Sequence, residues 1–107
     1  MRILAFKMVE PFKDSFGIKH YVANVPKQSM LIQLVEKNYT CDFELRFLGN
    51  PHLETEPRHY VRIKFGDDIS GVMPKGYAVY VGTYKCDLGI EYFIFELLNE
   101  DLPEITP

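Results

Sequence analysis

The chain has no tryptophan, no Cys-x-x-Cys pair and no apolar run long enough to cross a membrane. Lys and Arg number 12 against 15 Asp and Glu, and no stretch gathers them into a basic cluster. Nucleic-acid-binding domains normally carry such a cluster, and a membrane-spanning helix needs about 20 apolar residues. We therefore expect neither nucleic acid nor a membrane as a partner.

Signals for secretion, metal binding and catalysis are also missing. The first residues hold a short apolar run without the cleavage site of a signal peptide, so a cytosolic protein is expected. No two of its His and Cys residues have the spacing of a zinc site. No serine lies in a nucleophile motif. The sequence predicts a non-catalytic protein with no metal or cofactor.

The two cysteines, Cys41 and Cys86, leave two alternatives open. In a reducing cytoplasm we expect two free thiols. A disulfide between them is possible only if their strands are neighbours, which the sequence does not decide.

What the chain does have is aromatic and β-branched sequence. It is 107 residues long, in the single-domain range, with eight phenylalanines and seven tyrosines. The segment 77–98 is rich in these residue types on both sides of an Asp87-Leu88-Gly89 break. Aromatic and β-branched residues suit strands, and Asp and Gly suit turns. This segment predicts a long β-hairpin.

Shorter strands with turn signals at intervals of about 8–12 residues precede the hairpin. The clearest alternation is at 41–48, where apolar residues alternate with Asp42, Glu44 and Arg46. The pattern predicts an all-β fold: a single-domain antiparallel β-sandwich or partly open barrel over 1–98, with a flexible acidic tail at 99–107. About seven strands are expected, at 3–9, 18–25, 30–37, 41–48, 59–65, 77–86 and 90–98.

Several expectations follow for the faces of these strands. Pro11 should end the first strand. The strand 30–37 is apolar on both faces and should be central or covered. In 59–65 the even-numbered Tyr60 and Arg62 should face outward. Among the predicted core residues are Tyr21, Ala23, Val25, Phe43, Leu45, Val61, Ile63, Phe93 and Phe95.

The segment 66–76 has a glycine every five residues and begins Gly66-Asp67-Asp68. The two Asp residues indicate a turn more strongly than a cation site. Glycine-rich backbone can hold an anion, and nearby basic residues could supply charge. We therefore expect any anion site near this segment, with the basic residues Arg58, Arg62, Lys64, Lys75 and Lys85.

The order of segments resembles a family of small uncharacterised bacteriophage proteins over roughly residues 18–98. This resemblance implies an accessory protein made in the cytoplasm of an infected bacterium. The matching segments are Ala23-Asn24-Val25-Pro26, 30–47, 58–63, Tyr80-Val81-Gly82-Thr83-Tyr84 and Tyr92-Phe93-Ile94-Phe95-Glu96.

The expected function is counter-defence by binding: a homo-oligomeric sponge that sequesters a small anionic, nucleotide-type host signal. One alternative is a protein-binding inhibitor of a host defence enzyme, and another is a virion or assembly component. Arginine can bind phosphate through two nitrogens, and tyrosine can stack on a base. The predicted ligand-binding residues are Arg58, His59, Tyr60, Arg62, Tyr80 and Tyr84.

Overall fold

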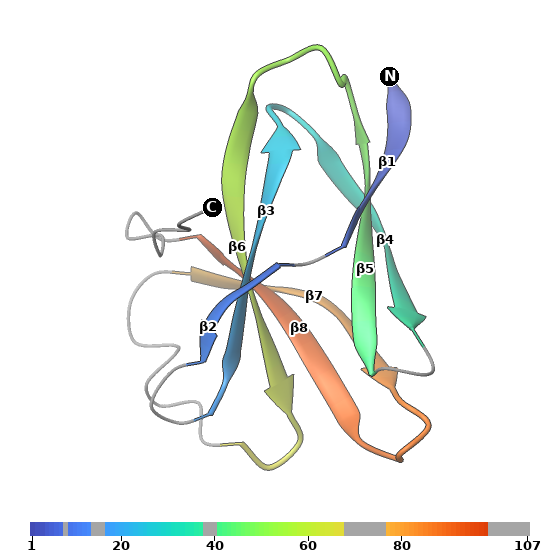
Figure 1. The fold of residues 1–107 in the computed structure, drawn as a ribbon, viewed down its shortest axis with the longest axis vertical. Helices are drawn as coiled ribbons and strands as arrows, with labels where there is room; N and C mark the ends of the chain where they lie inside the picture. The colour runs from blue at the N-terminus through green and yellow to red at the C-terminus, as the bar shows by residue number, and fades with distance from the viewer. Residues whose placement is uncertain (8, 14–16, 38–40, 68–76, 99–107) are drawn as a thin grey trace.

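A computed structural model of the chain describes residues 1–7, 9–13, 17–37, 41–67 and 77–98. These residues form eight strands and no helix (Figure 1). No described segment could therefore cross a membrane as a helix. The strands are β1 (Arg2–Lys7), β2 (Val9–Lys13), β3 (Lys19–Pro26), β4 (Met30–Lys37), β5 (Asp42–Gly49), β6 (Thr55–Lys64), β7 (Tyr77–Lys85) and β8 (Glu91–Leu98).

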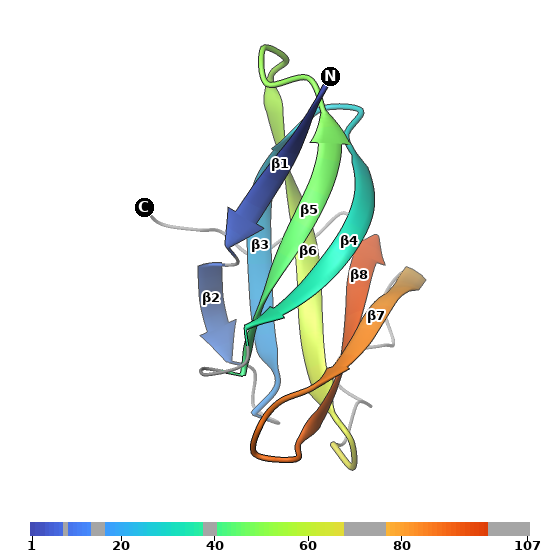
Figure 2. The same cartoon turned by 90° about the vertical axis from the view of Figure 1, so that its right-hand side faces the viewer.

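The strands form two antiparallel sheets. The smaller sheet has the order β1-β5-β4, and the larger sheet has the order β2-β3-β6-β8-β7. Figure 2 shows the smaller sheet packed in front of the larger one. The predicted all-β antiparallel sandwich is confirmed. Below, the inner face of the larger sheet is the one that meets the smaller sheet, and the outer face is the opposite one.

The beginning of the chain differs from the prediction. The expected strand 3–9 is divided between β1, in the smaller sheet, and β2, in the larger one. Pro11 does not end a strand but lies within β2. This is possible because β2 is an edge strand, where the missing N–H of proline removes no ladder bond.

The central strand of the smaller sheet follows the predicted alternation. Phe43, Leu45 and Phe47 on β5 are at most 2% exposed and pack into the main core. Tyr21, Ala23 and Val25 on β3 meet them from the larger sheet, as predicted. Burial of large apolar side chains is the main favourable term in folding, so this two-strand contact fixes how the sheets face each other.

The prediction for 30–37 is wrong, because β4 lies at the edge of the smaller sheet. Met30 is 62% exposed and Ile32 is 44% exposed. The register shifts between Leu31 and Gln33, so Ile32 is the extra residue of a bulge. Leu31 and Leu34 pack against the core. Apolar residues on both faces of β4 therefore did not mean that both faces are buried.

The larger sheet is buried on both faces at β6. Val61 and Ile63 lie on the outer face in a second cluster with Ile18 and Leu97. Tyr60 and Arg62 lie on the inner face and are buried, so the prediction that they face outward is wrong. Of the predicted core residues on β8, Phe93 and Phe95 are only partly buried.

The predicted hairpin at 77–98 is confirmed as β7 and β8. Its turn is closed by two backbone hydrogen bonds, from Cys86 N to Ile90 O at 3.1 Å and from Gly89 N to Cys86 O at 2.8 Å. Gly89 has a φ of 80°, a conformation that glycine adopts without steric cost. The break in the aromatic sequence therefore supplies the turn residue that this geometry needs.

A disulfide joins the sheets at the end where the hairpin turns. Cys41 immediately precedes β5 and Cys86 immediately follows β7, and their Cα atoms are 5.0 Å apart. The expectation of free thiols is therefore wrong. Closing 45 residues of chain should stabilise the fold by about 4 kcal/mol through the unfolded state.

Candidate functional site: a basic cleft

The six predicted ligand-binding residues do not share a surface. Arg58, Tyr60, Arg62 and Tyr84 lie between the sheets, where hydrogen bonds, rings and core contacts hold them. His59 and Tyr80 lie on the outer face, since each is paired in register with an odd-numbered β8 residue. The predicted site is therefore not one pocket, and each residue needs its own account.

A bulge in β7 separates the two tyrosines of the predicted site. Tyr84 pairs with Tyr92 and Tyr80 pairs with Phe95, with the register shift between Tyr80 and Gly82. The extra residue turns Tyr80 to the opposite face from Tyr84. Tyr80 is 57% exposed, and its hydroxyl shares a hydrogen bond with Thr83 Oγ1 at 2.6 Å.

Arg58 is held by a structural ion pair. Its Nη2 and Nε donate to the two carboxylate oxygens of Glu96 at 2.6 and 2.9 Å. Its Nη1 donates to Ser29 O at 3.2 Å, and its guanidinium lies 5.0 Å from the Phe47 ring centre. Tyr60 nearby is fully buried, and burial raises its pKa well above the usual value. Arg58 and Tyr60 therefore have a structural role.

His59 forms a buried pair with His20. His20 Nδ1 and His59 Nε2 are 2.8 Å apart. Within the described residues, His59 Nδ1 has no hydrogen-bond partner. Burial, followed by repulsion from His20, lowers the pKa of His59 to about 4. His59 is therefore neutral at neutral pH, and its place beside Val61 and Leu97 fits a structural role.

Arg62 has a different environment from Arg58. Its Nη1 donates to Cys41 O at 2.7 Å and to the Tyr84 hydroxyl at 3.3 Å. Its guanidinium lies 4.2 Å from the Tyr92 ring centre. Burial alone would lower its pKa, but the bond with Tyr84 and nearby tyrosines raise it overall. Arg62 is thus a fixed, permanently charged group with no carboxylate among these contacts.

Arg62 also lines a hollow of about 170 Å³ at the end of the larger sheet. The hollow lies where β3 begins and β6 ends. We call it, together with its neighbour Lys13, the basic cleft. The residues lining the hollow are Gly17, Lys19, Arg62, Lys64, Asp67 and Tyr92.

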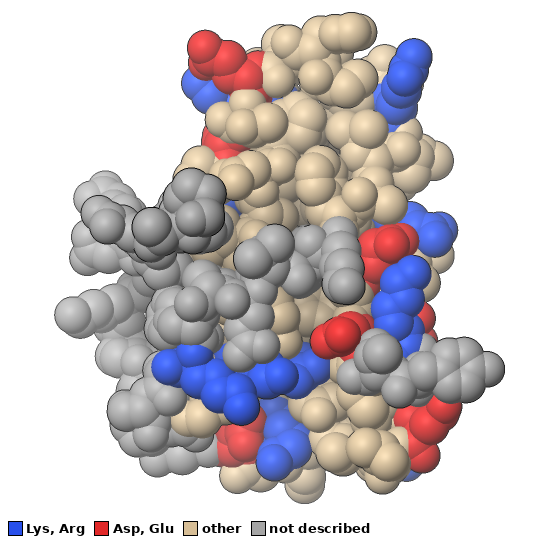
Figure 3. Space-filling model, viewed as in Figure 1, with Lys and Arg blue, Asp and Glu red and all other residues tan. Residues whose placement is uncertain are grey.

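The sheet register brings three cations into one row across this end. Lys13 on β2 pairs with Lys19 on β3, and Lys19 pairs with Arg62 on β6. Directly opposite residues of antiparallel strands point to the same face, so all three lie on the inner side. Figure 3 shows Lys and Arg atoms gathered across the lower part of the face it views. The register therefore gathers three positive charges at this end of the inner face.

Asp67 is the carboxylate in the lining of the cleft, and its contacts are those of a turn. Its Oδ2 accepts from Lys64 N at 2.8 Å, and its own N donates to Lys64 O at 2.9 Å. Gly66 between them has a φ of 94°. The predicted turn is present at Gly66 and Asp67. The rest of the proposed glycine loop, including Asp68 and Lys75, lies outside the described residues.

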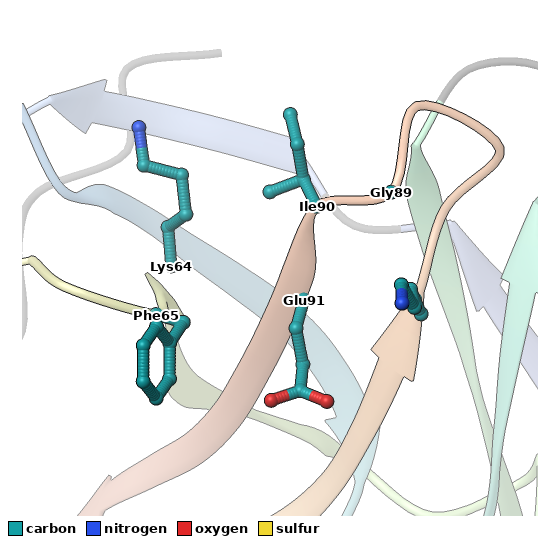
Figure 4. A pocket seen from close by; sticks show the side chains of 6 residues that line it. Lys64, Phe65, Gly89, Ile90 and Glu91 are labelled. Carbon is teal, nitrogen blue, oxygen red and sulfur yellow. The ribbon is translucent and has the colours of Figure 1, made fainter.

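A second hollow of about 410 Å³ adjoins the cleft and shares Lys64 with it. Figure 4 shows the Lys64 and Ile90 side chains pointing to one side, and Phe65 and Glu91 pointing to the other. Lys85 and Gly89 complete the lining. Phe65 is 75% exposed. With Glu91 among its lining groups, this hollow has less positive character than the basic cleft.

Sequence reasoning missed Lys13 and Lys19 because no strand was expected between 9 and 18, so the pairing of β2 with β3 was not predicted. A signal was available in Gly17, which lies between the two lysines, because glycine favours turns. In the structure Gly17 has a φ of 80°. Pairing β2 with β3 would have placed the two lysines opposite each other. Lys64 was identified as a basic candidate, and Arg62 was predicted as a ligand-binding residue.

Comparison with known proteins found no matching family model, no matching curated protein and no matching solved structure. Within the described residues, no three His, Cys, Asp or Glu side chains gather as a metal site would need.

Proposed function

We propose that the protein is a non-catalytic binding protein that holds the phosphate group of a small anionic ligand in the basic cleft. The environment of Arg62 supports this proposal most directly. The residue is only 8% exposed and lines the cleft, and within the described residues its Nε and Nη2 have no hydrogen-bond acceptor. A buried guanidinium with unused donors suits a phosphate, whose oxygens can accept two parallel bonds.

The other cleft residues support an anion more than a neutral ligand. Lys19 and Lys64 add two ammonium groups to the lining, and Lys13 adjoins Lys19. The hollow of about 170 Å³ is smaller than the 300–1,000 Å³ typical of sites that enclose a whole drug-sized ligand. The cleft therefore suits a phosphate group, while the rest of a nucleotide would lie over the adjoining hollow beside Lys64.

The biological role we propose is sequestration of a nucleotide-type host signal by a bacteriophage accessory protein. The resemblance of the chain to small phage proteins motivates this role, and the cytoplasm of the infected bacterium is the compartment that it implies. A binding protein with no catalytic group needs only to hold its ligand. The basic cleft offers charge and a shaped surface for that purpose.

The direct test is to measure pyrophosphate binding by calorimetry at low salt. Lys64→Ala, at an exposed cleft position, should weaken binding by about three- to tenfold, as expected for one charged contact of about 1 kcal/mol. Lys27→Ala is the matched control, because Lys27 follows β3 at its other end and pairs with Glu54. Equal loss in both variants, or no binding by the wild type, would reject the proposal.

A native ligand can be sought separately. Purified protein would be mixed with extract from infected cells, recovered and denatured, and the released small molecules identified by mass spectrometry. Recovery of a phosphorylated compound by the wild type, with less recovered by Lys64→Ala, is the expected result. Equal recovery by both proteins would place the ligand elsewhere.

One observation favours the alternative of a protein-binding inhibitor. On the smaller sheet, Ile3 and Met30 are both paired with Leu48 and are 67% and 62% exposed. Exposed apolar groups of this kind often mark protein contacts. Under this alternative, Met30→Lys should abolish capture of a host protein, while Lys64→Ala should leave the capture unchanged.

A further inference from the structure

We propose that the disulfide between Cys41 and Cys86 regulates the basic cleft, so that the oxidised protein binds its anion more tightly than the reduced one. This inference rests on the proposed function of the same site. It adds a form of control that the cleft residues alone do not supply.

The link between the disulfide and the cleft is the main-chain carbonyl of Cys41. It accepts a hydrogen bond from Arg62 Nη1 at 2.7 Å and another from the Tyr84 hydroxyl at 2.8 Å. Tyr84 lies two residues before Cys86, so the disulfide ties together both ends of this contact. Three strands, β5, β6 and β7, thus meet at one carbonyl that a covalent bond holds in place.

The backbone at Cys41 needs this support. Its φ is 56°, in the left-handed region that residues with a side chain adopt at a cost. Such a conformation persists where the surroundings over-determine it. Here the conformation of Cys41 is restrained by the disulfide and by the two hydrogen bonds to its carbonyl. Reduction removes the disulfide and lets the carbonyl move away from Arg62.

The consequence for the cleft follows from the geometry of Arg62. In the oxidised protein its guanidinium is fixed between Cys41 O, Tyr84 and the Tyr92 ring. A ligand then binds a group that is already ordered. Without the carbonyl the ligand must order the side chain itself, which weakens binding by about two- to twelvefold for one immobilised side chain.

The reaction is an ordinary thiol–disulfide exchange with a dithiol as reductant. A thiolate of the dithiol attacks one sulfur, forms a mixed disulfide and releases the other cysteine as a thiolate, which takes up a proton. The second thiol of the dithiol then displaces the protein sulfur. Two electrons and two protons pass to the protein, and the dithiol becomes a disulfide. Cys86 is 5% exposed while Cys41 is half-buried, so Cys41 is the more exposed of the two cysteines.

The experiment compares pyrophosphate binding by oxidised protein and by protein reduced with dithiothreitol, with thiol content confirmed by mass spectrometry. Reduction should weaken binding by about two- to twelvefold. A protein carrying both Cys41→Ser and Cys86→Ser should bind as the reduced protein does and should not respond to dithiothreitol. Equal affinity of the two redox forms would overturn this inference and leave the proposed function standing. Failure of both forms to bind would overturn the proposed function as well.

A second variant keeps the inference testable if reduction unfolds the protein. Tyr84→Phe retains the disulfide and removes the hydroxyl that shares the Cys41 carbonyl with Arg62. It should weaken pyrophosphate binding by about two- to fivefold, part of the ordering effect. Tyr80→Phe is the matched control on the same strand, since Tyr80 faces the opposite side. Unchanged affinity in Tyr84→Phe would contradict the inference.

Discussion

At the scale of single residues, the two buried arginines of β6 differ in their partners. Arg58 is matched by a carboxylate on a neighbouring strand. Arg62 is matched by a carbonyl, a phenol and aromatic rings. A buried charge that is paired with a carboxylate has a structural role. A charge that faces a cleft and is not bonded to a carboxylate can bind an anion. For this reason Arg62, and not Arg58, is the arginine that we expect to bind an anion.

The Arg58–Glu96 pair leads to a stability prediction. Glu96→Ala leaves a buried guanidinium without its carboxylate, and we expect the free energy of unfolding to fall by about 3 kcal/mol. Urea denaturation measures this loss. Glu54→Ala removes the partner of Lys27 in an exposed pair and should have a much smaller effect. A similar loss in both variants would show that burial does not matter here.

The buried histidine pair gives a pH prediction. The pKa of His59 is lowered from 6.5 to about 4 in the folded protein, so the unfolded chain binds a proton more readily. Its contribution to stability is present above pH 6.5 and is lost as the pH falls toward 4, by at most about 3 kcal/mol. Nuclear magnetic resonance titration should show His59 still neutral at pH 5.5. A midpoint near 6.5 for His59 would contradict this.

At the scale of elements, a close contact between β5 and the β3–β4 turn leads to a further stability prediction. A Cβ added at Gly49 would collide with Ser29 Oγ and lie 3.1 Å from Ser29 Cβ. The Ser29 hydroxyl is already held by Pro26 O at 2.6 Å. Gly49→Ala should lower the free energy of unfolding by about 1–3 kcal/mol.

Gly82→Ala is the matched comparison. Its added Cβ would meet Leu34 Cδ2 at 2.8 Å, the end of a side chain that can rotate away. It should therefore cost less than Gly49→Ala when both are measured by urea denaturation. The opposite order would mean that Ser29 can move more easily than its hydrogen bond to Pro26 suggests.

How much of each element could be predicted depended on its surroundings. Strand β5 was predictable because one of its faces is buried and its sequence alternates accordingly. The strand at β6 was also predicted, with Val61 and Ile63 in the core, but the burial of Arg62 was not. Both faces of β6 are buried, and the sequence does not distinguish a buried arginine from an exposed one. The bulge at Val81 decided the faces of Tyr80 and Tyr84, and nothing in the period-2 pattern reports an inserted residue.

The candidate site was predicted only in part for the same reason. Arg62 was chosen for its charge, but its position in a cleft depends on the register of β2, β3 and β6. Those pairings join residues far apart in the sequence, and spacing along one strand does not reveal them. The disulfide likewise depends on the start of β5 lying beside the end of β7, although the two strands belong to different sheets.

At the scale of the whole molecule, the smaller sheet has two edge strands, β1 and β4. Open edges with exposed apolar residues favour pairing with another chain. We expect a homodimer or larger symmetric oligomer, detected by light scattering at micromolar concentration. Met30→Lys should shift the population toward the 12.5 kDa monomer. A wild type that is monomeric throughout would contradict this prediction.

We propose that a phosphate group binds where β2, β3 and β6 meet. Chemical-shift mapping with ¹⁵N-labelled protein and pyrophosphate tests it most directly, because it locates the ligand without a mutation. The backbone amides of Gly17, Lys19, Lys64 and Asp67 should shift together on titration, while those of Lys27 and Ser29 at the far end of β3 should not. Shifts confined to other regions, or none at millimolar pyrophosphate and low salt, would contradict the account.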